Sequence, residues 1–155
     1  MTHIKPLFSP DSRCLLVPSG SSCGYCGVWD LVSSAYLALE MPPGGEDVYP
    51  VSAVFSRLGT HIAIGYRNGS IRIWDTTGRT RQEFLLLKAH EGWMSLRCGI
   101  LPGRLLSTSD DRTVKVWNVR TGVMVHLLEE HRADVHPACF SHVGSSWPLQ
   151  LPTGR

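Results

Sequence analysis

Three residues of the chain have the types needed for nucleophilic catalysis: His90, Ser107 and Asp111. In hydrolases a carboxylate orients a histidine, and the histidine takes the proton of a serine that attacks the substrate. Such a serine often lies in a sharp turn of sequence Gly-Xaa-Ser-Xaa-Gly. Ser107 lies in Leu-Leu-Ser-Thr-Ser instead. A hydrolase that uses these three residues is therefore kept only as an alternative interpretation.

The five cysteines suggest metal or redox chemistry. Cys23 and Cys26 have the Cys-Xaa-Xaa-Cys spacing, but a structural zinc site needs a second pair. Cys98 and Cys139 are isolated in the sequence. A redox motif would open a helix, whereas this pair falls in a turn that leads into a strand. The odd count also argues against a disulfide framework, so we expect free thiols in a cytoplasmic or nuclear setting.

Histidine and arginine groups offer two further possibilities. His131 and His136 are five residues apart, which is not a dependable metal-ligand spacing on a strand or loop. A loose basic group is expected on solvated strand edges and loops, with phosphate or acidic-peptide binding as the alternative. Its members are Arg67, Arg72, Arg79 and Arg81. No aromatic residues are interleaved with them as a stacking platform, so we expect no nucleic acid as partner. We also expect no metal and no cofactor.

A repeated segment sets the framework that must position these residues. Each copy is a turn, then alternating residues, then Trp followed by Asp or Asn. The copies are residues 23–30, 68–75 and 111–118. Their tryptophans, Trp29, Trp74 and Trp117, are 45 and 43 residues apart. That period is typical of four-stranded repeats of about 40–45 residues.

The strands of the second copy can be predicted from its residues alone. Residues 51–55 are apolar, which suits a buried strand, and residues 61–66 alternate. Asn68-Gly69 is a strong signal for a two-residue hairpin turn, because both residues tolerate positive φ. Residues 71–74 then alternate, with Ile71 and Ile73 expected on one face. No segment has a clean 3.6-residue period, so we expect no helix.

Two smaller markers accompany the repeat and carry a family resemblance. One is Phe-Ser, at residues 8–9, 55–56 and 140–141, and the other is an Xaa-His pair, at residues 89–90 and 130–131. With the three Trp-Asp or Trp-Asn pairs, they make residues 4–141 resemble the WD-repeat β-propeller family. The resemblance implies an all-β fold of about three four-stranded antiparallel blades plus one extra strand, an incomplete and open propeller.

The repeat divides the chain into five parts. The predicted divisions are 1–41 for a degenerate first blade, 42–88 for the second, 89–129 for the third and most complete, 130–141 for the first strand of a truncated blade, and 142–155 for an irregular tail. The tail has two prolines and no alternation. We expect it to be disordered or loosely packed.

The resemblance gives His90, Ser107, Asp111 and Trp117 a structural role. In the family, residues at these positions form a hydrogen-bonded network within one blade, which is the interpretation we favour over catalysis. Ser109 lies on the same predicted strand face as Ser107, so the choice between the two serines stays open. The other blades depart from the pattern. Asn68 and Cys23 replace the aspartate, and neither blade has the histidine.

The resemblance also implies where partners bind. In the family, binding residues often precede the turn aspartate or follow the Xaa-His pair. The matching positions here are Ser22, Arg67, Asp110, Glu91 and Trp93. Trp93 is the first candidate, because aromatic residues dominate interface hot spots, with packing between blades as the alternative.

Composition and resemblance together indicate an interaction scaffold and not an enzyme. The chain has 155 residues and a formal net charge of +2, too small to indicate an anionic membrane or nucleic acid as partner. Three blades cannot close a ring, so we expect a fragment or truncated isoform of a longer propeller that binds other proteins, or self-association that completes the propeller. A nonfunctional or dominant-negative truncation is the alternative.

Overall fold

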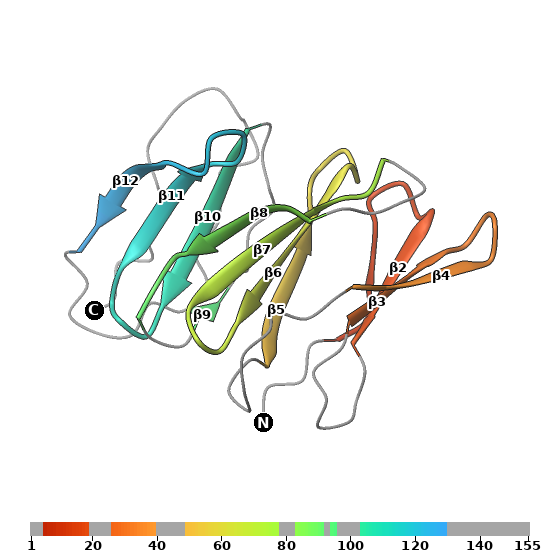
Figure 1. Cartoon of the computed structure of the whole chain (residues 1–155), viewed down its shortest axis with the longest axis horizontal. Coiled ribbons are helices and arrows are strands. Elements are labelled where there is room, and N and C mark those ends of the chain that lie inside the picture. The colour runs from red at the N-terminus through yellow and green to blue at the C-terminus, as the bar shows by residue number, and fades with distance from the viewer. Residues whose placement is uncertain are drawn as a thin grey trace, which may run out of the picture.

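The computed structural model of the chain consists of three antiparallel β-sheets (Figure 1). The structure describes residues 5–18, 26–39, 49–77, 83–91, 94–95 and 103–129. The extra strand predicted at 130–141 and the tail at 142–155 lie outside these residues. Within them there is no helix, as predicted. No helix of the described part is therefore long and apolar enough to cross a membrane.

Each sheet has four strands in which every strand pairs with the next one along the chain. The first sheet contains β1 (Leu7–Phe8), β2 (Cys14–Pro18), β3 (Cys26–Asp30) and β4 (Ala35–Leu39). The second contains β5 (Pro50–Phe55), β6 (His61–Tyr66), β7 (Ser70–Asp75) and β8 (Glu83–Lys88). The third contains β9 (Met94–Ser95), β10 (Arg104–Ser109), β11 (Val114–Asn118) and β12 (Met124–Leu128). The prediction of an open stack of about three four-stranded blades is confirmed.

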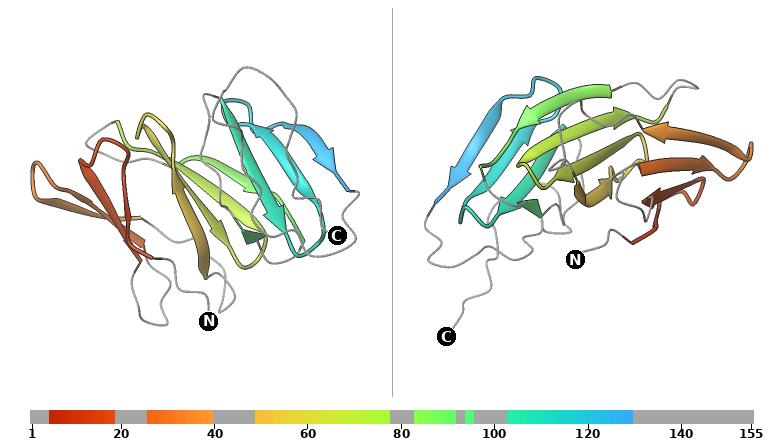
Figure 2. Two further views of the ribbon diagram at one scale, coloured as in Figure 1. Left: turned by 180° about the vertical axis from the view of Figure 1, so that it is seen from behind. Right: turned by 60° about the horizontal axis from the view of Figure 1, so that its bottom comes forward.

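The sheets stack side by side in chain order, with their first strands toward one another (Figure 2). Strand β5 contacts both β1 and β9, so the first strands of the three sheets form the inner side of the stack. The fourth strand of each sheet lies on the outer side. This arrangement places the turns between strands on two rims, one at each end of the strands.

Alternation decides which side chains enter each contact between sheets. In β6 and β7, Ile64 and Trp74 face the first sheet, while Ala63 and Ile73 face the third. The first contact buries Leu16, Cys26, Val28 and Leu39 with Phe55, Ile62, Ile64, Tyr66 and Trp74. The second buries Ala63, Ile71, Ile73 and Leu87 with Leu105, Trp117 and Val119. In both, the face that carries the tryptophan packs on the aliphatic face of the preceding sheet.

Among the described residues, no sheet precedes the first one to cover its tryptophan face. Phe8, Leu15, Trp29 and Tyr36 are direct cross-strand neighbours in register and form a row across all four strands. Trp29 is 41% exposed, and its ring lies 5.0 Å from that of Tyr36 at an angle of 49°. The first sheet therefore presents an apolar row to solvent where the other two sheets bury theirs.

Two glycines with positive φ lie in turns of the third sheet. Gly103, at φ 76°, accepts a hydrogen bond from Val119, and Gly122, at φ 70°, donates one to Asn118. A Cβ atom at Gly122 would come within 3.0 Å of Leu85 in the second sheet, whereas nothing lies within 4 Å of such an atom at Gly103. The Gly122 turn is thus part of the contact between sheets.

We expect Gly122→Ala to destabilise the protein more than Gly103→Ala. Both substitutions put an L side chain at positive φ, which costs about 1 kcal/mol. Only the substitution at Gly122 also displaces Leu85. Urea unfolding followed by tryptophan fluorescence measures both. Equal losses of unfolding free energy would show that this turn contributes nothing to the contact between the sheets.

Candidate functional site

The backbone around His90 joins the second sheet to the third. The N–H groups of Ala89 and His90 both donate to the carbonyl oxygen of Gly69, at 3.0 Å each. Gly69 lies at φ 80° in the β6–β7 turn, a conformation that suits glycine. The segment after β8 is thereby held against this turn. The His90 side chain extends from it into the third sheet.

Four side chains of the third sheet form one chain of hydrogen bonds. The Trp117 Nε1–H donates to Ser107 Oγ at 2.9 Å, and the Ser107 hydroxyl donates to His90 Nε2 at 2.8 Å. His90 Nδ1–H then donates to Asp111 Oδ2 at 2.8 Å. This order of donors requires the neutral His90 tautomer with its proton on Nδ1. The four residues singled out from the sequence therefore meet, and the serine in the network is Ser107.

Thr113 and Lys115 also belong to the site but were missed from the sequence. The Thr113 hydroxyl donates to Asp111 Oδ1 at 2.7 Å, and the Thr113 N–H donates to the same oxygen at 3.0 Å. Lys115 Nζ donates to the Ala89 carbonyl oxygen at 2.7 Å. The signals were available: Thr113 follows Asp111 by two residues, as in an Asx turn. Lys115 precedes Trp117 by two and so shares its face.

Burial and hydrogen bonding fix the charges of the two titratable groups. Burial of His90 lowers its pKa, although Asp111 pulls the pKa the other way. For Asp111, partial burial raises the pKa, but hydrogen bonds from Thr113 and His90 outweigh it and lower the pKa to about 2. At neutral pH the network holds a neutral imidazole and an ionised carboxylate.

The geometry does not suit a nucleophile. Ser107 is 0% exposed, and its oxygen already accepts a hydrogen bond from the Trp117 indole N–H. A substrate could not reach it without opening the contact between the second and third sheets. The same bonds satisfy every buried polar atom of the chain of four, which is what a structural network requires.

The second sheet lacks this network. By register, Ile64 occupies the Ser107 position, because it pairs with Arg72 as Ser107 pairs with Lys115. The Trp74 indole nitrogen, buried by the first sheet, has no hydrogen-bond partner in the described part of the chain. Asn68 accepts from the Ser70 N–H and hydroxyl, at 3.1 and 2.6 Å. It therefore shapes the turn and does not hold a histidine.

The first sheet has no polar groups at the corresponding positions. Val17 stands at the Ser107 position, and Gly27 at the Lys115 position. The Tyr36 ring lies over Gly27, where any side chain would overlap it. Cys23 lies outside the described residues. Cys26 is a free thiol, and burial raises its pKa to about 11, which opposes the thiolate form that metals need.

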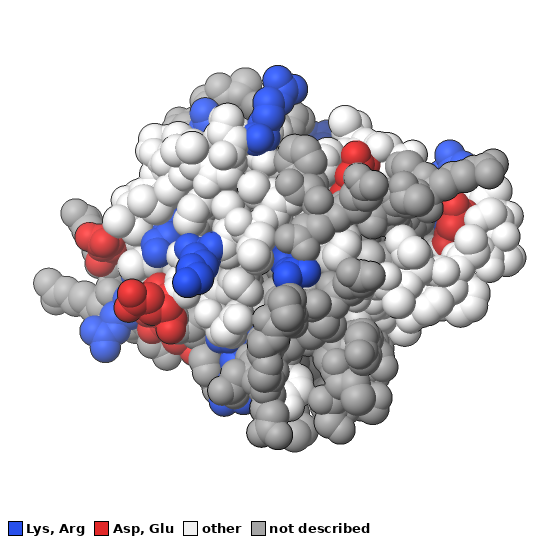
Figure 3. Space-filling view, in the orientation of Figure 1, with Lys and Arg blue, Asp and Glu red and all other residues white. Residues whose placement is uncertain are grey.

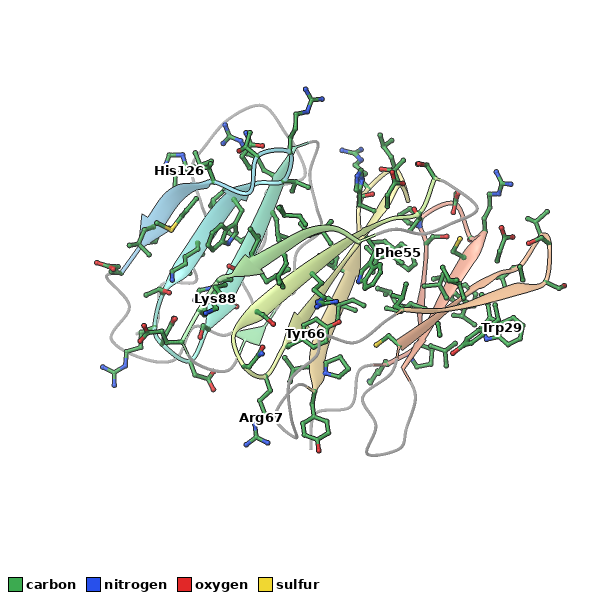
Figure 4. All side chains as sticks on the ribbon, in the orientation of Figure 1. Trp29, Phe55, Tyr66, Arg67, Lys88 and His126 are labelled. Carbon is green, nitrogen blue, oxygen red and sulfur yellow. The ribbon has the colours of Figure 1, made fainter. Side chains whose placement is uncertain are left out.

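The candidate partner-binding residues lie on one rim as far as the structure describes them. Arg67, Glu91 and Asp110 are exposed, and the label in Figure 4 marks Arg67 at the β6–β7 turn. Ser22 and Trp93 lie outside the described residues. His90 connects the three, since its backbone is bonded to the β6–β7 turn and its ring to the β10–β11 turn.

The expectation of a solvated arginine group is wrong for one member. Arg72 is buried, because it alternates with Ile71 and Ile73 and its strand face packs on the first sheet. Arg67 is exposed, and Arg79 and Arg81 lie outside the described residues, as do His131, His136, Cys98 and Cys139. Figure 3 shows lysine and arginine separated by neutral surface on the face in view. The described residues include no group of three side chains that could hold a metal ion.

We expect Ser107→Ala to lower the free energy of unfolding by about 2 kcal/mol, because it leaves both His90 Nε2 and Trp117 Nε1 buried without a partner. Ser109→Ala is the matched control, since Ser109 is equally buried and accepts only from the Asp111 N–H. We expect about 1 kcal/mol for it. Urea unfolding measures both free energies. A larger loss for Ser109→Ala than for Ser107→Ala would show that Ser107 is not the serine of the network.

Stability should fall as the pH is lowered through about 6.5. His90 has a lowered pKa when folded and an ordinary value of 6.5 when unfolded, so the unfolded chain binds the extra proton in this range. His90→Gln should flatten the slope between neutral and mildly acidic pH. Urea midpoints at a series of pH values test this. An unchanged slope would mean that His90 gains its proton equally in both states.

Comparison with known proteins supports the family resemblance. A model of the WD domain, G-beta repeat, matches residues 45–75 and 82–118. The chain is 27% identical over 114 residues to the "Ribosome biogenesis protein WDR12 homolog" of Chlamydomonas reinhardtii, which is 66% of this chain and 24% of that protein. It is 28% identical over 127 residues to a "Guanine nucleotide-binding protein subunit beta" of Schizosaccharomyces pombe, 82% of this chain and 40% of that protein.

Solved structures show the same fold. A chain in the "Crystal Structure of Mitotic Checkpoint Complex" superimposes with a TM-score of 0.71 at 20% identity, over 87% of this chain and 39% of that one. The "Crystal structure of RRP9 WD40 repeats" gives 0.69 at 26% identity, over 86% and 40%. The chain thus spans less than half of each relative. Its repeats, its register and these matches show that the chain is similar to part of a WD40 repeat propeller.

Proposed function

We propose that the chain is a non-catalytic protein-interaction module whose contact surface is the rim formed by the β6–β7 turn, the segment after β8 and the β10–β11 turn. WD40 repeat domains typically serve as interaction scaffolds. The observation that carries the proposal is the position of His90, which bonds two of these rim segments and extends from the third. Arg67, Glu91 and Asp110 are exposed on them.

A rim held in this way is suited to recognition. Binding costs less when the contact residues are already ordered, and here hydrogen bonds from buried groups hold the backbone on which they stand. The exposed side chains of the rim include arginines as well as carboxylates, so the rim can orient a partner through charges of both signs. We propose other proteins as the partners.

The uncovered tryptophan face gives a second reason to expect protein contacts. At both contacts within the chain, such a face is covered by an aliphatic sheet face. A further sheet packed on Phe8, Trp29 and Tyr36 would repeat that arrangement, whether it came from a longer propeller or from another molecule. A second copy joined head to tail is a poor candidate, because Leu106, Val114 and Val116 on the far face of the third sheet are already buried.

The free thiol of Cys26 fits a reducing compartment. We therefore propose that the module acts in the cytoplasm or the nucleus.

Substitution at the two ends of one sheet tests the rim. Arg67 and Arg57 are both exposed arginines in hairpin turns of the second sheet, at opposite rims. We expect Arg67→Ala to reduce retention of captured proteins by about tenfold, a change typical of a binding hot spot. Arg57→Ala should leave retention unchanged. The measurement is affinity capture by the tagged chain with quantitative mass spectrometry, and circular dichroism verifies folding.

Either of two results would contradict this proposal. If Arg57→Ala reduced the retention of captured proteins as much as Arg67→Ala does, the contact surface would not be this rim. If Trp29→Glu abolished the capture of proteins that Arg67→Ala still retained, binding would be assigned to the open face of the first sheet.

A further inference from the structure

The β6–β7 turn contains an asparagine followed directly by a glycine, Asn68 and Gly69. Asn68 is exposed, and it follows Arg67, whose side chain extends away from the sheet in Figure 4. In such a pair the backbone nitrogen of the glycine can attack the side-chain carbonyl carbon of the asparagine, because glycine has no Cβ to obstruct the approach. The turn therefore holds a carboxamide beside an intramolecular nucleophile.

The hydrogen bonds of the Asn68 side chain favour this attack. Its Oδ1 atom accepts from the N–H and the hydroxyl of Ser70, at 3.1 and 2.6 Å. Donors in this position polarise the carbonyl group and stabilise the negative charge that its oxygen gains when a nucleophile adds. Among the described residues, only these two donors bond to the carboxamide, so its nitrogen is free to leave as ammonia.

The backbone of the folded turn restrains the nucleophile. The Gly69 N–H donates to the Tyr66 carbonyl oxygen at 3.0 Å, and the Gly69 carbonyl oxygen accepts from Ala89 and His90. The nitrogen must leave the Tyr66 carbonyl before it can attack. Opening one surface turn costs much less free energy than unfolding the chain. We therefore expect folding to slow the reaction without preventing it.

The third sheet provides a precedent for the product of the reaction. Asp111 has the turn position of Asn68, since each lies six residues before the tryptophan of its own sheet. Asp111 accepts from the Thr113 N–H and hydroxyl at 3.0 and 2.7 Å, as Asn68 accepts from Ser70. An aspartate at position 68 can therefore keep both bonds, with a charged acceptor in place of a neutral one.

We propose that Asn68 is a site of spontaneous deamidation and that the fold retains the aspartate product. The Gly69 nitrogen gives up its proton and bonds to Cγ of Asn68, and the bond from Cγ to Nδ2 breaks with release of ammonia. Water then opens the cyclic imide. Cleavage at Cγ gives aspartate with the original backbone. Cleavage at the backbone carbonyl gives isoaspartate, whose extra main-chain carbon displaces Gly69 from Tyr66.

The reaction changes the charge of the rim. The formal net charge of the chain falls from +2 by one unit, and the new carboxylate lies next to Arg67 in the sequence. The modification does not depend on whether the rim binds partners. Where the rim does bind them, deamidation alters the charge of the contact surface while the turn keeps its shape.

The chain contains its own control for the experiment. Its other asparagine, Asn118, lies in a similar turn, because its Oδ1 accepts from the N–H groups of Arg120 and Thr121. The residue that follows it, however, is Val119. The branched Cβ of valine obstructs the approach of the backbone nitrogen to the side chain.

Mass spectrometry of the aged protein tests the site. The purified chain is kept in mildly alkaline buffer, with and without guanidinium chloride, and digested with trypsin, which releases residues 68–72 as one peptide. We expect the folded chain to deamidate at Asn68 at least ~tenfold faster than at Asn118, because the following residue is glycine and not valine. The denaturant should speed the reaction at Asn68, because it frees the Gly69 nitrogen.

Substitution tests whether the fold retains the product. Asn68→Asp should keep the urea midpoint of unfolding, whereas Asn68→Ala should lower it, because alanine accepts neither bond from Ser70. The proposal is overturned if the folded chain keeps the Asn68 amide while the denatured chain loses it, or if Asn118 reacts as fast. It is also overturned if Asn68→Asp lowers the midpoint as much as Asn68→Ala does.

Discussion

A four-stranded sheet has two faces, and in this chain each contact between sheets joins a tryptophan face to the aliphatic face of the preceding sheet. Trp74 and Trp117 occupy equivalent register positions in the two contacts. Burial of these large side chains removes apolar surface from water, which is the main favourable contribution to folding. Because the contact is directional, a stack of sheets has one end that exposes its tryptophan face. In this chain Trp29 lies at that end.

The polar network of the third sheet lies inside one of these apolar contacts. A buried serine and histidine are tolerated there because each finds a partner and because Asp111 keeps its charge near the rim. In the second sheet Ile64 replaces the serine, and the indole nitrogen of Trp74 is left without an acceptor among the described residues. The two contacts therefore have the same shape but different polarity. Of the described ones, only the second ties its sheets together through a histidine.

That histidine links the core to the surface. Its backbone bonds to one turn and its side chain to another, so stability of the network and order of the rim depend on the same residue. The rim and the open Trp29 face are thus separate surfaces with different chemistry, one charged and the other aromatic. Each has its own physical reason to engage another molecule.

The sequence by itself determined the strands and the turns, because periods of two and of about 43 residues reflect local geometry and repetition. The family resemblance, and not the period, pointed to His90, Asp111 and Trp117 as network members. The sequence could not choose between Ser107 and Ser109 or anticipate Thr113, Lys115 and the burial of Arg72. Those depend on which strand face meets a neighbouring sheet. Only the tertiary structure decided that Trp29 is open while Trp74 and Trp117 are covered, since exposure is a property of the stack and not of the repeat.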